Sequence, residues 1–507
     1  MHATTWPRFL ACLITLAPAA PLGADGLLQN RCTAIVRSRD LGETTVSVLV
    51  QDLSDNEVLA QINPHARMIP ASNMKLITTA AALKLLGADF EFRTELRLIE
   101  DVPSPDDGAA ATPGMVAVIV GDGDPALGDP KVLSNHNLDI DQMLEAWVQV
   151  IKNAGVEHLS RLAVDDRVFD QAWVHPDWPR DQLNRWYCAQ VAGLNIHENC
   201  VYVYPRPTQV GHSPRIMLRP AAKFISGLAR NRSVTDRRDT FWVSRKLNTN
   251  ELTYRGKIRH KREKPVKVAL HDPPLFMARL LAEQLRAAGV RVDHVDRAGP
   301  EEQFPPSRPL LRWVTPIQDV LRRCNKDSQN LFAEALIKRV GRHVTGARGS
   351  WETGAAAVRM FLQQRLGPNA AVVNISDGSG MSRNNRITAR TIVNLLHIMH
   401  RDTPLAGIYR DSLAIGGVDG TLRKRFGGAL NGTVHGKSGF INGVCTLSGY
   451  LVSSEEDREP RVVAFSLLFN DIKAPVYVHD IKKLQGELIS TIDRHIAPPV
   501  EVVELGG

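Results

Sequence analysis

The chain has 507 residues, of which 43% are hydrophobic and 23% are charged, and this balance predicts a soluble protein with two or more domains. The formal net charge of +8 suits an anionic neighbourhood such as a cell wall or a membrane surface. No RNA- or DNA-binding signature accompanies that charge, so we expect no nucleic-acid partner.

Residues 1–24 have the pattern of a secretory signal peptide. Arg8 precedes a short apolar core at Phe9–Ala17, and the small residues of Ala19–Ala24 offer a cleavage site. We therefore expect a secreted protein whose mature chain starts near Asp25. No later stretch approaches 18 apolar residues, so a transmembrane anchor is not expected.

The six cysteines match no zinc-binding pattern. Cys12 lies within the apolar core of the signal, so its removal would leave an odd number. Cys188 and Cys200, twelve residues apart, are the candidate disulfide on proximity alone.

The mature chain is expected to open with a β-hairpin and a buried helix. Thr45–Val50 and Val58–Ile62 have the composition of strands, with a turn at Asp55–Asn56 between them. The following segment, Leu76–Leu86, contains no Gly or Pro and is apolar on most of a helical surface. A helix of that kind is buried.

Ser72 and Lys75 stand three residues apart where this helix should begin, because Pro70 blocks helix upstream and Ser72 is a suitable N-cap. Residues three apart share a helix face, with Cβ atoms about 5–6 Å apart. Such a serine becomes a nucleophile when the lysine is desolvated and neutral. The alternative is a capping serine beside a solvated lysine. The buried helix favours the nucleophile, and no other lysine has a serine three residues before it.

From Glu91 the pattern changes to short strands separated by polar loops. We interpret residues 91–267 as a β-rich insertion of one or two modules, within a catalytic domain formed by residues 27–90 and 268–497. The insertion ends in a basic run, Arg255–Lys267. A solvated loop or hairpin is the favoured interpretation of that run, and a polyanion-binding site is the alternative. The predicted strands of the insertion are Arg93–Leu98, Met115–Val120, Leu162–Val164, Val201–Tyr204 and Phe241–Ser244.

The last part of the chain alternates helices with strands. Predicted helices cover Pro273–Ala288, Thr315–Cys324, Asn330–Gly341, Ser350–Leu366, Ala389–His400 and Val478–Ile496. Predicted strands cover Leu310–Val314, Val434–Lys437, Cys445–Val452 and Val462–Phe469.

Three short motifs follow one another along the chain. They are Ser72-Asn73-Met74-Lys75, Ser328-Gln329-Asn330 at a break between two helices, and Lys437-Ser438-Gly439 leaving a strand. Together S-x-x-K, S-x-N and K-[ST]-G are the signature of serine β-lactamases and penicillin-binding proteins, although each is weak alone. Ser382-Arg383-Asn384 also matches S-x-N and is the rival candidate for the second motif. Ser54-Asp55-Asn56 matches as well, but it lies in a predicted hairpin turn.

The third motif also resembles a phosphate-binding P-loop at Gly432–Ser438. That stretch is one residue short of the P-loop pattern, and strand-like residues follow it where a P-loop needs a helix. Phosphate binding is therefore disfavoured.

With these motifs the chain resembles the low-molecular-mass class C penicillin-binding proteins, the D-alanyl-D-alanine carboxypeptidase/endopeptidase family. The long insertion between the first two motifs is a mark of that class. The D-G-S-G-x-S-R loop is another, and it accounts for Ser382 as a loop residue. One departure is Ser438, where the family usually has Thr. The resemblance covers nearly the whole mature chain and includes Pro70–Lys75, Gly121–Pro125, Asn325–Glu334, Asp377–Arg383, Gly417–Leu422 and Gly436–Gly439.

The resemblance implies a mixed α/β fold of the penicillin-binding-protein and serine β-lactamase kind. A mixed sheet flanked by helices, split by the large β-rich insertion, would hold the site between sheet and helices. Ser72 would attack the peptide carbonyl and form an acyl-enzyme, and Lys75 would take its proton. Ser328 would relay a proton to the leaving amine, and Asn330 would orient Lys75 and the substrate.

The implied third motif completes the site. Lys437 would supply a positive field that keeps Lys75 neutral, and Ser438 would donate a hydrogen bond to the substrate carboxylate. The backbone N–H groups of Ser72 and of Phe440, after Gly439, would form the oxyanion hole. No metal or other cofactor is implied.

The resemblance therefore implies a periplasmic serine D-alanyl-D-alanine carboxypeptidase/endopeptidase. It would cleave peptidoglycan stem peptides and cross-links, and penicillins and other β-lactam antibiotics would acylate it. A serine β-lactamase, which differs by fast deacylation, is an alternative that the large insertion disfavours. A catalytically silent wall-binding scaffold is a second alternative, which the complete set of motifs disfavours.

Overall fold

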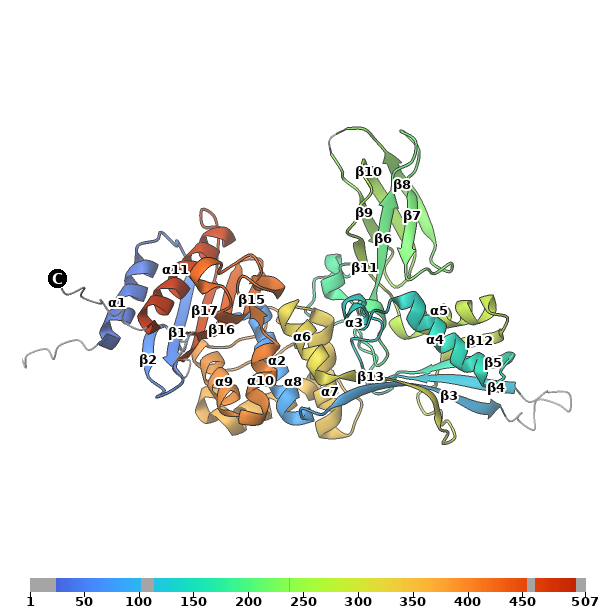
Figure 1. The fold of residues 1–507 in the computed structure, drawn as a ribbon, viewed down its shortest axis with the longest axis horizontal. Coiled ribbons are helices and arrows are strands. Elements are labelled where there is room, and N and C mark those ends of the chain that lie inside the picture. Colours follow the sequence, from blue (N-terminus) through green and yellow to red (C-terminus); the bar gives the residue numbers. More distant parts are fainter. Residues whose placement is uncertain (1–23, 102–113, 237, 454–460, 498–507) are drawn as a thin grey trace, which may run out of the picture.

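The computed structural model describes residues 24–101, 114–236, 238–453 and 461–497, and they form an elongated molecule (Figure 1). A six-stranded sheet with its helices occupies one end, and a five-stranded sheet occupies the other. A smaller β module projects to one side of the long axis. The helices and strands fit the α/β class that the sequence predicts.

The six-stranded sheet joins the two ends of the described chain. Its strand order is β14-β15-β16-β17-β1-β2, and every neighbouring pair is antiparallel. The expected mixed sheet is therefore wrong in this part, because tight turns join β15 to β16 and β1 to β2, and such turns produce antiparallel neighbours. The strands are β1 (Thr45–Asp52), β2 (Val58–Ile62), β14 (Ala414–Ile415), β15 (Val434–Ile441), β16 (Val444–Val452) and β17 (Val462–Asn470).

Helices cover both faces of this sheet. Helices α1 (Ala24–Arg37) and α11 (Val478–Ile496) pack on one face, where they share a hydrophobic cluster with the strands. The other face packs on α2 (Met74–Leu86) and α9 (Ala389–Arg401). The remaining helices of this end are α6 (Ile317–Lys326), α7 (Asn330–Thr345), α8 (Trp351–Leu366) and α10 (Thr403–Asp411).

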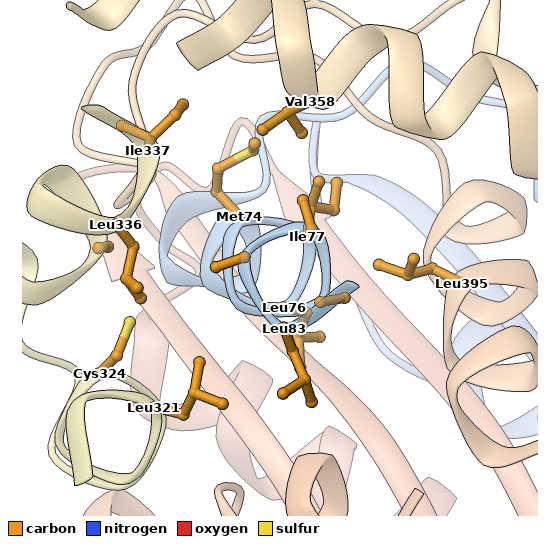
Figure 2. Packing of buried hydrophobic residues seen from close by; sticks show 14 of the residues in the cluster. Met74, Leu76, Ile77, Leu83, Leu321, Cys324, Leu336, Ile337, Val358 and Leu395 are labelled. Carbon is orange, nitrogen blue, oxygen red and sulfur yellow. The ribbon is translucent and has the colours of Figure 1, made fainter. Parts of the chain in front are cut away.

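Helix α2 is buried around its whole circumference from Met74 to Leu83, as its apolar composition predicts. Figure 2 shows α2 end-on, with side chains of the surrounding helices in contact with it, among them Leu321 of α6 and Leu395 of α9. Such packing fixes the first turn of the helix, where Ser72 and Lys75 lie. Ser72 is not the N-cap, because a short 3-10 turn over Ala71–Asn73 precedes the helix and Asn73 occupies the cap position.

The insertion is built on a five-stranded mixed sheet with order β12-β5-β4-β3-β13. The strands at the C-terminal end of this unit pair with strands that come much earlier in the sequence. β12 runs parallel to β5, and β13 runs antiparallel to β3. The predicted boundary at residue 267 lies inside this unit, which continues to Pro316. Its elements are β3 (Glu91–Asp101), β4 (Gly114–Val120), α3 (Pro130–Asn135), α4 (Ile140–Asn153), β5 (His158–Asp165), α5 (Pro273–Ala287), β12 (Arg291–Arg297) and β13 (Pro309–Pro316).

The projecting module contains two three-stranded sheets, with orders β11-β6-β7 and β8-β10-β9 (Figure 1). The predicted basic run divides between the end of β10, a loop over residues 259–265, and the start of β11. The strands are β6 (Cys200–Arg206), β7 (Arg215–Arg219), β8 (Gly227–Ser233), β9 (Trp242–Arg245), β10 (Leu252–Ile258) and β11 (Val266–Ala269).

Three further expectations can be compared with this fold. The disulfide between Cys188 and Cys200 is wrong, because both thiols are free and pack in different hydrophobic clusters. Thr315 belongs to β13, so α6 begins two residues later than predicted. The signal-peptide expectation concerns residues 1–24, nearly all of which lie outside the described residues. Within the described ranges, no helix has the length and apolarity needed to cross a membrane.

Candidate active site

The three sequence motifs meet at one cleft between the six-stranded sheet and the helices. Ser72 precedes α2, Ser328 lies between α6 and α7, Asn330 begins α7, and Lys437 is on β15. The cleft has a volume of about 1380 Å³, and its lining includes Ser72, Ser328, Asn330 and the exposed Phe440. The S-x-x-K, S-x-N and K-S-G residues predicted from the sequence are thus brought together by the fold.

Lys75 is fully buried and its Nζ has three oxygen partners. The distances are 3.1 Å to Ser72 Oγ, 2.7 Å to Asn330 Oδ1 and 2.9 Å to the Ser379 carbonyl oxygen. The amide and carbonyl oxygens can only accept hydrogen bonds, whereas the serine hydroxyl can also donate. A neutral Lys75 would therefore use its two N–H bonds on Asn330 and Ser379, and its lone pair would face the Ser72 hydroxyl.

The environment of both active-site lysines disfavours their charged forms. Burial lowers the pKa of Lys75, and the acidic groups nearby, including Glu334 and Asp377, only partly offset that effect. Burial also places the pKa of Lys437 well below the ordinary lysine value, and the charge of Lys75 lowers it further. Desolvation is thus the first cause of both pKa shifts, and the sequence-based expectation also required a desolvated Lys75. Repulsion by the other lysine contributes to the shift of Lys437.

Lys437 connects the second motif to the third. Its Nζ donates to Ser328 Oγ at 2.9 Å and to the Ser438 carbonyl oxygen at 2.8 Å. Ser328 has a φ of 58°, in the left-handed region that non-glycine residues rarely adopt. This backbone conformation lies at the break between α6 and α7 and turns the hydroxyl toward β15.

The Ser379 carbonyl that binds Lys75 is held by two buried acidic side chains that the sequence motifs do not include. Glu334 accepts hydrogen bonds from the backbone N–H groups of Gly378 and Ser379, at 2.8 and 2.9 Å. Asp377 accepts from Gly380 N at 2.9 Å. Burial, followed by the nearby Asp377, raises the pKa of Glu334 to about 7. Glu334 lies in a stretch typical of the family, but nothing in the local pattern indicates its contacts.

Gly439 is needed where β15 passes the Ser72 backbone. A Cβ atom added at Gly439 would lie 2.9 Å from Ser72 N and 2.2 Å from Thr446 Oγ1. Real Cβ atoms do not approach so closely, so a side chain at this position would push β15 away from Ser72. Asn73 Nδ2 also donates to the Lys437 carbonyl oxygen at 3.1 Å, which ties the start of α2 to the same strand.

Ser438 faces a second, smaller cavity of about 190 Å³ beside Ser72 and Ser328. Its hydroxyl donates to Thr421 Oγ1 at 3.0 Å. Arg425 also lines this cavity. Its guanidinium donates to Gln485 Oε1 at 3.0 Å and to the Lys482 carbonyl oxygen at 3.3 Å, and within the described part of the chain no carboxylate pairs with it. Thr421 lies in the family-like stretch Gly417–Leu422, whereas only the fold places Arg425 here.

Ser382, the rival candidate for the second motif, has a different environment from Ser328. Ser382 is buried, and its hydroxyl donates to Asp177 Oδ2 at 2.5 Å. Asp177 also accepts from Ser376 and Asn384, so this hydroxyl belongs to a network that holds the loop. Lys75 bonds to Ser379 of the same loop and not to Ser382.

Comparison with known proteins gives one family for this fold and site. The model of the D-Ala-D-Ala carboxypeptidase 3 (S13) family matches residues 28–488. A D-alanyl-D-alanine carboxypeptidase of Actinomadura sp. (strain R39) is 30% identical over 492 residues, which cover 91% of this chain and 85% of the relative.

Two comparisons concern Haemophilus influenzae. The D-alanyl-D-alanine carboxypeptidase DacB of that organism is 23% identical over 444 residues, covering 84% of this chain and 85% of the relative. The crystal structure of its penicillin binding protein 4 superposes with a TM-score of 0.73 at 22% identity, covering 91% of this chain and 99% of the other. That likeness concerns the fold.

Proposed function

The chain belongs to the D-Ala-D-Ala carboxypeptidase 3 (S13) family of serine-type peptidases, and on that premise we propose that it cleaves D-alanyl-D-alanine peptides through an acyl-enzyme. The substrates would be peptidoglycan stem peptides and cross-links, so both carboxypeptidase and endopeptidase activities belong to the proposal. β-Lactam antibiotics would acylate the same serine. The observation that carries the proposal is the contact of buried Lys75 with Ser72, Asn330 and Ser379.

The proposed reaction begins with proton transfer from Ser72 Oγ to neutral Lys75. Ser72 Oγ then attacks the carbonyl carbon of the penultimate D-alanine, and the negative charge develops on the carbonyl oxygen. The backbone N–H groups of Ser72 and Phe440 are the proposed donors to that oxygen. Gly439 directly precedes Phe440, and a Cβ atom at Gly439 would lie 2.9 Å from Ser72 N, so glycine leaves room there for close approach.

Collapse of the tetrahedral intermediate breaks the peptide bond and leaves Ser72 acylated. The departing amine takes up the proton that Ser72 gave to Lys75, which makes Lys75 neutral again. The Ser328 hydroxyl, which lies 2.9 Å from Lys437 Nζ, is the proposed relay for that proton. Water then attacks the acyl-enzyme and restores Ser72. The terminal carboxylate of the substrate would lie in the smaller cavity, beside Ser438, Thr421 and the guanidinium of Arg425.

Labelling with a fluorescent penicillin tests the proposal against its alternatives. A persistent covalent adduct on Ser72, with release of D-alanine from a D-Ala-D-Ala peptide, is the expected result. Rapid turnover of the penicillin without an adduct would indicate a β-lactamase. An absence of reaction with both compounds would indicate the silent scaffold. Ser72→Ala, which lacks the nucleophile, is the matched control.

We propose a periplasmic location for the mature protein. The proposal is supported by the signal-like pattern of residues 1–24 and by the nature of the proposed substrate. The protein should be released from cells by osmotic shock without detergent, with an N-terminus near Asp25. Recovery of an intact Met1 in the cytoplasm would contradict this location.

A further inference from the structure

The sheet β8-β10-β9 of the projecting module has one packed face and one open face (Figure 1). Side chains alternate between the faces of a strand. Leu252, Tyr254 and Ile258 of β10 point into a hydrophobic cluster, so Arg255 and Lys257 belong to the opposite face. The active-site motifs contribute no residue to this sheet.

The open face concentrates positive charge across neighbouring strands. Arg255 is the direct partner of Arg230 on β8, and Lys257 is the direct partner of Arg232. Like charges opposite each other destabilise a sheet. Lys257 Nζ pairs with Asp236 at 2.8 Å, but within the described ranges no carboxylate pairs with the three arginines. Folding alone does not account for this arrangement, whereas an anionic ligand would offset the repulsion.

An aromatic ring lies in the same row of side chains. Trp242 on β9 is the partner of Arg255 in the register, and its side chain is 49% exposed. The guanidinium carbon of Arg255 lies 5.5 Å from the centre of the Trp242 ring. An exposed ring beside cations is suited to stack on a sugar ring while the cations bind carboxylates.

We propose that this basic sheet face, formed by Arg230, Arg232, Arg255, Lys257 and Trp242, binds peptidoglycan strands at a distance from the active site, with the cations on carboxylates of the stem peptides and the ring on a sugar of the glycan. The inference rests on the proposed function for the identity of the polymer. A polymer held here would present its peptides to the cleft at a raised local concentration. The basic run predicted from the sequence would then contribute to a polyanion site through Arg255 and Lys257, with β8 supplying the other cations.

A charged lipid surface is the main competing partner. The cations of the basic sheet face lie on two adjacent strands, β8 and β10, and Trp242 continues their row onto the third strand, β9. This distribution suits an extended polymer lying across the strands. The experiment therefore measures binding to both partners.

The test uses the full chain with Ser72→Ala, so that the polymer is not cleaved. Binding to purified insoluble peptidoglycan is measured by co-sedimentation, with and without the four substitutions Arg230→Gln, Arg232→Gln, Arg255→Gln and Lys257→Gln. Exposed ion contacts are individually weak, but four together should raise the dissociation constant about tenfold or more at low salt. Trp242→Ala should also weaken binding to peptidoglycan. Because the ring carries no charge, the loss caused by this substitution should differ from the loss that added salt causes in the parent.

A second quadruple variant separates the effect of the basic sheet face on binding from the effect of net charge, because it removes four exposed cations that lie elsewhere on the protein. Its substitutions are Arg31→Gln, Lys152→Gln, Arg279→Gln and Lys483→Gln. Binding by this control should stay within about twofold of the parent at the same salt concentration, since its cations are scattered and contribute little each. Equal losses of peptidoglycan binding in both quadruple variants would overturn the proposal. It would also be overturned if the basic-face variant lost binding to phosphatidylglycerol vesicles but kept its binding to peptidoglycan.

Small-peptide kinetics, measured with Ser72 intact, separate this inference from the proposed function. The basic-face variant should keep its kcat/KM on a soluble D-Ala-D-Ala peptide while losing activity on the polymer. If the parent enzyme cleaves no such peptide, the proposed function fails. If it cleaves the peptide and the face variant binds peptidoglycan as the parent does, the inference alone fails.

Discussion

Asn330 Oδ1 accepts a 2.7 Å hydrogen bond from Lys75 Nζ across 255 positions of sequence. The same amide donates through Nδ2 to the Tyr187 carbonyl oxygen of the insertion at 2.9 Å, which fixes which end of the amide faces the lysine. Asn330 therefore holds Lys75 through an acceptor that cannot protonate it. The lysine lone pair is left for Ser72.

The serines Ser72, Ser328 and Ser382 should differ in how much their loss slows acylation. Ser72→Ala should abolish acylation by penicillin, with a loss on the order of 10³–10⁶ in rate, as for nucleophiles that act within a unit. Ser328→Ala should also be severe, because its hydroxyl is the group bonded to Lys437. Ser382→Ala should be mild, since it removes only hydrogen bonds within the loop, one to Asp177 and one from the Asn384 backbone N–H. Stopped-flow measurement of the acylation rate of each variant tests this prediction. If Ser382→Ala lowers the rate more than Ser328→Ala does, the second motif is misassigned.

The carboxylate site should distinguish a free terminal carboxylate from its amide. A hydrogen bond to a charged group contributes about 1.5–3 kcal/mol, so Ser438→Ala should lower kcat/KM by about 10- to 100-fold on a D-Ala-D-Ala peptide. Arg425→Gln should act in the same direction, because it removes one of the two cations, Arg425 and Lys482, that line that cavity. Ser438→Thr should be tolerated as a matched control. Equal losses on the peptide and its C-terminal amide would refute the assignment.

Glu334 should make stability depend on pH. Its pKa is raised to about 7, so the folded state holds this proton more tightly than the unfolded chain, where glutamate titrates near 4.3. The stabilisation is complete below about pH 4.3 and is lost as the pH rises through about 7. Glu334→Gln cannot titrate. The advantage of the wild type over this variant in urea unfolding should therefore shrink between pH 5 and pH 8, and a constant or growing advantage would contradict the assignment.

The sequence predicted the parts of the site that depend on local spacing. Ser72 and Lys75 could be placed together because both lie within one helical turn, and Ser328 and Lys437 followed from short motifs. The Ser379 and Tyr187 carbonyls could not be predicted, because a backbone acceptor leaves no mark on residue identity. Their positions are set by loop conformation and by packing between distant segments.

The strand β12 was not predicted from the sequence for a related reason. β12 carries charged residues at most positions, with Val292 and Val295 as its apolar members, so it lacks the composition of a buried strand. Charged residues are typical of edge strands, and β12 is at the edge of its sheet. The helix α5 has an apolar face that would fit either sheet. The pairing of β12 with β5 and the packing of α5 in the hydrophobic cluster of the same sheet place both elements beside the insertion.

The insertion also contacts the second motif through a buried arginine. Arg323 of α6 donates to Asp129 and Glu198 of the insertion, at 2.7 and 2.6 Å, and to Asp327 at 2.7 Å. Asp327 directly precedes Ser328. Glu198 also accepts a hydrogen bond from Gln329, the middle residue of the motif, at 2.8 Å. The insertion thus helps to set the conformation at the break between α6 and α7.

Arg323→Ala should therefore affect both stability and acylation. It leaves the buried Asp129 carboxylate without its cation and removes one of the two cations of Glu198, the other being Lys267. Breaking a buried ion pair from one side costs about 3–5 kcal/mol in the free energy of unfolding. Arg322→Ala is the matched control, because Arg322 is exposed and its pair with Asp319 is worth at most about 1 kcal/mol. The acylation rate is compared at a temperature where both variants remain folded. If Arg323→Ala lowers stability but acylates at the wild-type rate, the arginine stabilises the junction without positioning Ser328. If both quantities match those of Arg322→Ala, the buried network has neither role.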